Sequence, residues 1–169
     1  IKRFVLRGQY QRAVEFGERV EEWSFTKPRT TDAERVVWDS WNHTLARQER
    51  AIWTNRARIR LGKNTGRAIK DIKESIHKLQ LLYDADVRTK VGELCTDDHI
   101  EWGFKGLPEK GIADHPAYLR LRQLLSQAHN FLGFSYRMQG EIERAVEYYG
   151  VALHLILQAK TGVVSAQHA

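Results

Sequence analysis

The clearest concentration of chemically active side chains in this sequence is a run of basic residues between positions 47 and 73. The run holds nine cations and two acidic residues, so its net charge is nine minus two, or +7, against +6 for the whole chain. Its cations are Arg47, Arg50, Arg56, Arg58, Arg60, Lys63, Arg67, Lys70 and Lys73. Guanidinium and ammonium groups bind carboxylates and phosphates. The run therefore predicts a surface for either an acidic protein segment or a nucleic-acid backbone.

The candidate basic face comprises six of these cations: Arg47, Arg50, Arg56, Arg60, Lys63 and Arg67. On a helix, Arg56, Arg60, Lys63 and Arg67 would form one stripe, whereas Arg47, Arg50 and Arg58 fall partly elsewhere around it. No base-reading motif accompanies the run, and Trp53 is the aromatic residue within it. This pattern favours an acidic protein or peptide partner, with nucleic acid as the alternative.

A second group of chemically capable residues lies between positions 95 and 101. Cys95, Asp97, Asp98, His99 and Glu101 are all of metal-ligand type, but their spacing matches no zinc or calcium pattern. We therefore expect no metal. The aromatic residues that follow, Trp102 and Phe104, could anchor a partner, or could fold back over the end of a helix pair.

Catalytic motifs are not found in the sequence. A lone cysteine has no family-type context, and no Gly-x-Ser-x-Gly elbow occurs. The stretch Gly62-Lys63-Asn64-Thr65-Gly66 only superficially resembles a phosphate loop. We expect no enzyme activity and no cofactor. The single cysteine favours a reducing, cytoplasmic setting. The sequence contains no run of eighteen apolar residues, so we expect no membrane-spanning helix.

Three similar segments indicate the elements that must position these side chains. Residues 11–16, 66–71 and 143–148 each hold a basic residue, an alanine and a β-branched aliphatic residue in the same order. Each follows a glycine, which suits the end of one helix, and the alanine lets the next helix pack closely. The aligned alanines are Ala13, Ala68 and Ala145. The sequence therefore predicts repeated pairs of helices.

The third copy carries the most specific pattern: Leu132-Gly133-x-x-Tyr136, then Gly140, Ala145, Tyr149 and Ala152. It resembles the tetratricopeptide repeat. The resemblance implies an all-α fold in which antiparallel helix pairs stack as an α-solenoid, with partners bound along the first helix of each pair. Carried over to this sequence, the partner-binding groove would include Gln127, Asn130, Phe134, Arg137 and Met138. The alanines lie 55 and 77 residues apart, against about 34 in a plain array, so we expect longer helices and one extended connection.

Apolar spacing divides the chain into five parts. We expect a partial repeat over 1–24 (its turn and second helix), a long hairpin over 31–94, an extended loop over 95–114, a helix pair over 115–160 and a tail over 161–169. In the hairpin, a seam of Trp38, Leu45, Ile52 and Ile59 faces Ile69, Ile72, Ile76, Leu79 and Tyr83. In the last helix, Val146, Tyr149, Leu153 and Ile156 are expected to face inward.

The expected function is protein–protein recognition, as a scaffold, sensor or regulatory segment of a larger intracellular signalling protein. The sequence begins at Ile1 with no initiator methionine, which suggests a piece of a longer chain. Two alternatives remain open. The basic face could bind nucleic acid, or the seam from Trp38 to Ile59 could face a second copy of the chain.

Overall fold

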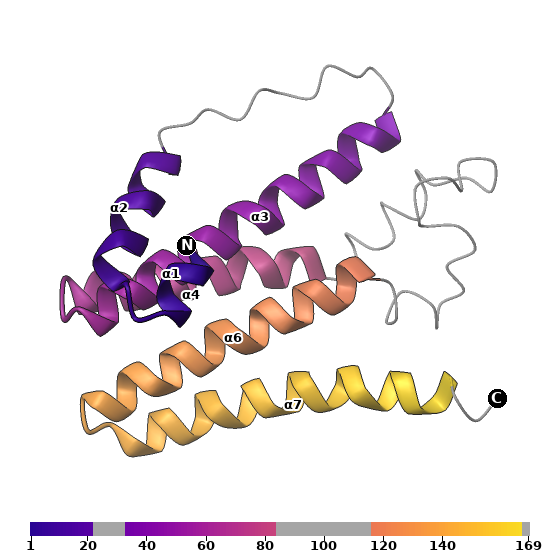
Figure 1. The fold of residues 1–169 in the computed structure, drawn as a ribbon. Coiled ribbons are helices and arrows are strands. Elements are labelled where there is room, and N and C mark those ends of the chain that lie inside the picture. The colour runs from indigo at the N-terminus through magenta and orange to yellow at the C-terminus, as the bar shows by residue number, and fades with distance from the viewer. Residues whose placement is uncertain (22–32, 84–115, 167–169) are drawn as a thin grey trace.

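The computed structural model of the chain describes residues 1–21, 33–83 and 116–166, and every regular element in these ranges is a helix (Figure 1). The six helices are α1 (Lys2–Leu6), α2 (Tyr10–Glu21), α3 (Ala33–Arg60), α4 (Thr65–Tyr83), α6 (Pro116–Met138) and α7 (Ile142–Ala166). The all-α prediction is confirmed. Side chains are described for residues 1–20, 43–82 and 119–157.

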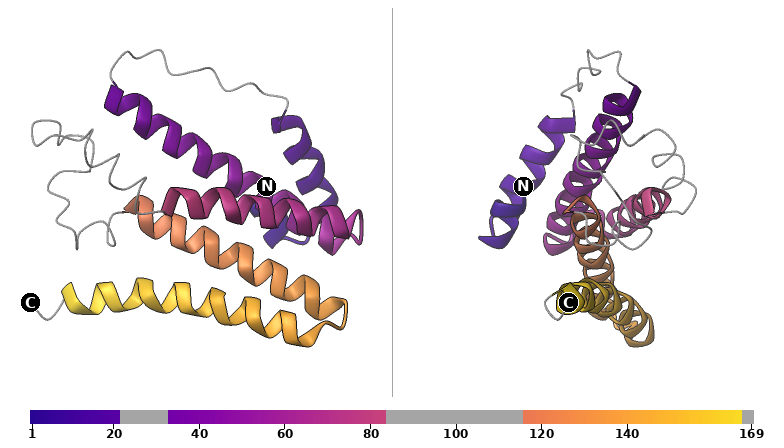
Figure 2. Two further views of the ribbon diagram at one scale, coloured as in Figure 1. Left: turned by 180° about the vertical axis from the view of Figure 1, so that it is seen from behind. Right: turned by 90° about the vertical axis from the view of Figure 1, so that its right-hand side faces the viewer.

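Helices that follow one another in the chain pack against one another. Contacts join α1 with α2, α2 with α3, α3 with α4, α4 with α6, and α6 with α7; α3 also contacts α1 and α6. Figure 2 shows α6 lying between α4 and α7. The helices α3 and α4 form one hairpin and α6 and α7 form another, as the apolar spacing predicted.

The three turns between paired helices share one hydrogen-bond pattern. At the end of α3, the amides of Gly62 and Lys63 donate to the carbonyls of Ile59 and Arg58, both at 3.0 Å. The same two bonds recur around Gly8 and around Gly140. This is the Schellman motif, whose central residue adopts positive φ, and Gly62 (φ 65°) provides it without a steric penalty. The predicted role of these glycines as helix terminators is confirmed.

The predicted hairpin seam forms the core. In α3, Leu45 and Ile52 are fully buried and Ile59 is nearly so, in one cluster with Ile69, Ile72, Ile76 and Leu79 of α4. The cluster continues into α6, where the rings of Trp53 and Phe131 meet edge to face with centroids 4.9 Å apart. Because this seam is already covered within one chain, the hypothesis that it faces a second copy is wrong for Leu45, Ile52 and Ile59.

The predicted inward face of the last helix is wrong for three of its four residues, while Tyr149 is partly buried and packs against the core as predicted. In α7, Ala145 and Ala152 are buried, whereas Val146, Leu153 and Ile156 are 63%, 57% and 44% exposed. The small alanines form the contact with α6 because the two helices lie too close together for large side chains. Ser126 Oγ of α6 donates a hydrogen bond to the Ala152 carbonyl at 2.8 Å. The large aliphatic side chains are left on the opposite side of the helix.

Two predicted boundaries differ from the structure or lie outside it. The helix α7 continues to Ala166, so the tail predicted over 161–169 is helical in its first six residues. The helix includes Gly162, although glycine lowers helix propensity by about 1 kcal/mol relative to alanine. The extended loop 95–114, with Cys95, Trp102 and Phe104, lies outside the described residues. No helix in the described ranges has the length and apolar character needed to cross a bilayer.

Candidate binding surfaces on two faces of α3

The predicted basic face is divided between opposite sides of α3. Each residue turns a helix by about 100°, so Arg56 and Arg58 point roughly 200° apart. Arg56 and Arg60 lie one turn apart on the side where α1 and α6 pack. Arg47 and Arg58 lie about three turns apart on the side where α2 and α4 pack. The shared side of Arg56 and Arg60, and the different direction of Arg58, agree with the prediction. Arg67 was expected in the stripe of Arg56 and Arg60 but lies on the side of Arg58 instead, so the cations form two surfaces.

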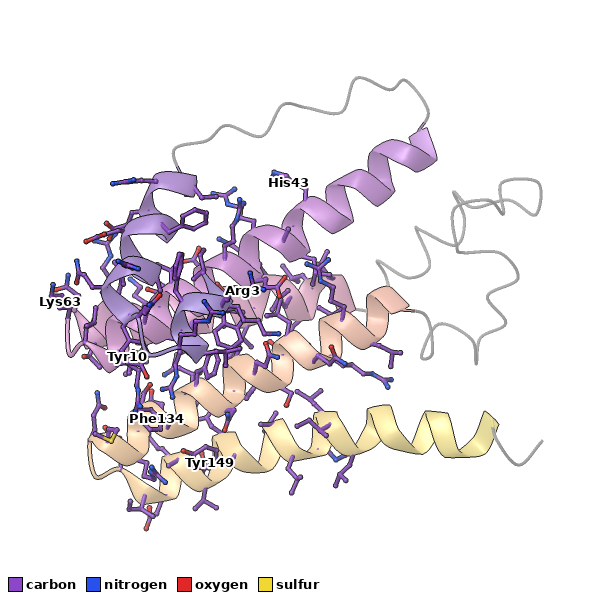
Figure 3. The ribbon with its side chains drawn as sticks, in the orientation of Figure 1. Arg3, Tyr10, His43, Lys63, Phe134 and Tyr149 are labelled. Carbon is purple, nitrogen blue, oxygen red and sulfur yellow. The ribbon has the colours of Figure 1, made fainter. Side chains whose placement is uncertain are left out.

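The first surface, which we call the α1/α3/α6 surface, is organised around the ring of Phe134. Three guanidinium carbons lie near its centroid: Arg56 at 4.0 Å, Arg60 at 5.0 Å and Arg137 at 5.5 Å. Figure 3 shows Phe134 on α6, near Tyr10 at the start of α2. Each contact is a cation–π attraction. The half-buried ring thus gathers two arginines of α3 and one of α6.

No carboxylate of a described residue balances this group of arginines. Within the described residues, Arg56, Arg60 and Arg137 form no ion pair. Arg60 Nε donates to the Tyr10 hydroxyl at 3.2 Å, while Arg56 Nη1 is buried without a hydrogen-bond partner. Burial, and then the neighbouring charge of Arg60, lower the Arg56 pKa to about 10. Arg56 stays protonated at neutral pH, so the surface carries concentrated positive charge.

The surface continues onto α1. Lys2 Nζ lies 5.6 Å from the Trp53 ring centroid, and the buried Trp53 Nε1 has no hydrogen-bond partner. A ligand on this side of α3 would therefore meet cations from three helices and an apolar aromatic floor.

The structure brings most of the predicted groove residues to this end of α6. Asn130, Arg137 and Met138 are exposed, with Met138 at 67% exposure, and Gln127 is partly exposed. Phe134 is half-buried among the arginines rather than packed in the core. The sequence could not show that Arg56 and Arg60, 74 or more residues earlier, share its ring.

The second surface is an open cleft of about 690 Å³, which we call the α2/α3/α4 cleft. Three members of the predicted basic face line it: Arg47, Arg50 and Arg67. The sixth predicted cation, Lys63, lies at the α3–α4 turn and donates to Gln11 Oε1 at 3.2 Å. The complete lining is Gly17, His43, Arg47, Gln48, Arg50, Ala51, Thr54, Asn55, Arg58, Arg67, Asp71, Glu74, Ser75 and Lys78.

Part of the positive charge in the cleft is neutralised. Arg58 Nη2 lies 3.0 Å from Glu18 Oε1, and Lys78 Nζ lies 2.6 Å from Glu74 Oε1. By contrast, Arg47 and Arg67 form no ion pair with a described residue. Sequence reasoning did not predict that Gln48, Ser75 and Lys78 line the cleft. One signal was present: a spacing of 4, 3 and 4 residues indicates a single polar face of α4, formed by Arg67, Asp71, Glu74 and Lys78.

Neither surface has the side chains of a metal centre. Among the residues that the structure describes, no three or more His, Cys, Asp or Glu residues are grouped as metal ligands. Comparison with protein-family models, with curated proteins and with solved structures gives no match for this chain.

Proposed function

We propose that this chain is a protein-recognition module of tetratricopeptide-repeat type, whose α1/α3/α6 surface binds an acidic segment of a partner protein. The observation that carries the proposal is the group of three guanidinium groups around Phe134, with which no described carboxylate forms an ion pair. In the proposal, the consecutive helix pairs stack as an α-solenoid. The identical glycine turns and the packing of α3 against both α1 and α6 support that arrangement.

The chemistry of the surface suits a carboxylate-bearing ligand with an apolar side chain. Arginine binds a carboxylate through two parallel hydrogen bonds, and partial burial strengthens such a contact. The unpartnered Arg56 Nη1 would gain a hydrogen bond on binding. Phe134 and exposed Met138 would contact the apolar part of the segment. The module would then serve as a scaffold, sensor or regulatory segment of a larger intracellular protein.

Nucleic acid is the second candidate, and the cation distribution favours it less. A backbone contact needs several free cations along one face. Here the cations of positions 47–73 are divided between two faces, and Arg58 is engaged by Glu18. The two candidates predict different salt dependence, because each phosphate contact steepens the fall of affinity with salt.

The test is fluorescence anisotropy with two labelled peptides of equal length. One contains glutamate and leucine, and the other replaces each glutamate by glutamine. We expect the acidic peptide to bind and the amide peptide to bind far more weakly. Arg60→Gln and Arg137→Gln should each lower the affinity about tenfold, since each removes a charge-assisted contact.

The matched control is Arg19→Gln, an exposed arginine of α2 outside this surface. It should leave the affinity unchanged. Equal binding of both peptides, or equal loss in Arg19→Gln, would contradict the proposal. A single-stranded RNA that binds the chain more tightly than the acidic peptide, with a steep salt dependence, would favour the nucleic-acid candidate instead.

A further inference from the structure

We propose that the α2/α3/α4 cleft is a second binding site, separate from the partner surface, and that it takes a small phosphorylated sugar or polyol. The cleft and the α1/α3/α6 surface lie on opposite sides of α3. The inference therefore goes beyond the recognition of an acidic protein segment.

The first argument is a set of polar side chains that line the cleft and form no side-chain hydrogen bond with a described residue. Gln48, Thr54 and Ser75 are only 6%, 3% and 2% exposed, and all three line the cleft. None of them forms a side-chain hydrogen bond with another described residue. Their amide and hydroxyl groups face the cleft's solvent, because none of them is among the buried polar atoms without a partner. They are therefore available to donate and accept hydrogen bonds to a bound molecule.

The second argument is the free positive charge beside these groups. Arg47 of α3 and Arg67 of α4 are both exposed and both lack an ion pair with a described residue. Arg58, 21% exposed, is held in place by Glu18 and by Asn55 Oδ1 at 2.9 Å. Arginine presents a planar set of donors that matches phosphate geometry. Two free guanidinium groups and one fixed one would therefore bind phosphate oxygens.

The remaining lining residues select what else the ligand carries. Asp71 and Glu74 repel a bare phosphate but accept hydrogen bonds from hydroxyl groups. Of the described lining residues, Gly17 and Ala51 lack a polar side chain, and no broad apolar wall is present to stack a nucleobase. A volume of about 690 Å³ lies in the usual range for small-molecule sites. These features fit a hydroxyl-rich, phosphorylated ligand.

The test is isothermal titration calorimetry on the full chain with three probes: fructose 1,6-bisphosphate, inorganic phosphate and fructose. We expect one-site binding of the bisphosphate, weaker binding of phosphate and none of fructose. Arg47→Gln and Arg67→Gln should each weaken bisphosphate binding about tenfold. Both arginines are exposed and unpaired, so the variants should fold normally. Arg137→Gln, on the other surface, is the matched control and should bind as the wild type does.

A second variant tests the unbonded groups without changing charge. Ser75→Ala should weaken bisphosphate binding severalfold and should not lower the melting temperature, because the hydroxyl has no partner in the free protein. Failure of the bisphosphate to bind at millimolar concentration would overturn the proposal. So would equal weakening by Arg137→Gln, or a short RNA that binds more tightly and loses affinity in the same variants. The peptide assay with Arg60→Gln tests acidic-segment binding separately, so failure of the bisphosphate to bind would leave that proposal standing.

Discussion

Gly133 of α6 lies directly against α7, and its missing side chain sets how closely the two helices approach. A Cβ at this position would come within 2.8 Å of the Tyr149 ring and 3.1 Å of the Ala145 carbonyl oxygen. The ring can move, but the backbone oxygen can do so only if the helices separate. We expect Gly133→Ala to lower the free energy of unfolding by about 1–3 kcal/mol, measured by urea denaturation.

Gly150 of α7 provides the control, since a Cβ there would meet no atom within 4 Å. Gly150→Ala should raise the free energy of unfolding by roughly 0.5–1 kcal/mol, because alanine has the higher helix propensity. If both substitutions changed stability in the same direction, the close approach at Gly133 would not be the cause.

His129 connects stability to pH at the same interface. It is 7% exposed, its Nδ1 lies 2.8 Å from the Leu125 carbonyl oxygen, and its ring faces Tyr148. Burial lowers the His129 pKa below its usual 6.5, against an opposing hydrogen bond to Leu125. Below about pH 6.5 the unfolded chain therefore binds a proton that the folded chain resists. Stability should fall as pH drops through this value, and level off below the folded pKa.

Urea denaturation at pH 7.5 and pH 5 checks this expectation. His129→Gln should show a smaller loss of stability at low pH than the wild type does. His77→Gln, at an exposed position on α4, should keep the wild-type loss. An unchanged loss in His129→Gln would assign the pH dependence to other groups.

At the scale of single elements, α7 is the helix whose exposed side differs most from expectation. Leu153 is 57% exposed, whereas Leu132 of the facing helix is fully buried. Leu132→Ala should cost about 2–5 kcal/mol of unfolding free energy, and Leu153→Ala less than about 0.5 kcal/mol. The same urea titration compares the two leucines. Similar costs would show that the large aliphatic side chains of α7 do face the core, as the sequence predicted.

Apolar spacing predicted the long hairpin well. Both α3 and α4 lie within the predicted range 31–94, because a seam such as Leu45, Ile52 and Ile59 leaves a single way to bury three aliphatic side chains. In α7 two stripes compete, one of alanines and one of large aliphatic residues. Sequence reasoning chose the larger side chains. Because α6 approaches α7 closely at Gly133, the alanine stripe is buried instead. This approach depends on α6, so the sequence pattern of α7 alone does not predict it.

For the candidate sites, the sequence predicts some of the residues involved but not which of them lie together. The sequence shows Phe134 and Arg137 on one helix, and Arg56 and Arg60 on another. That these four side chains meet around one ring depends on how α3 packs against α6. Likewise, the charge run from 47 to 73 is visible in sequence, but its division between two faces follows from α2, α4, α1 and α6 packing on different sides of α3.

For the whole molecule, α3 is the shared wall of both proposed sites. Arg56 and Arg60 point to the acidic-segment surface, and Arg47 and Arg58 point to the cleft on the other side. The two ligands would not compete for space. Both would reduce the positive charge on the same helix, so each would weaken the electrostatic attraction for the other over roughly one Debye length.

The apolar side of α7 has a further consequence for how the protein opens. Within the described residues α7 is packed against α6, whereas α3 has neighbours on several sides. In the proposed α-solenoid, stability is approximately the sum of each unit and its contacts with adjacent units. Amide protons of α7 should therefore exchange with solvent through a local opening, while those of α3 need wider unfolding. A helix docked on Val146 and Leu153 would slow that exchange, so the exchange rate of the α7 amides reports whether this side of α7 is covered.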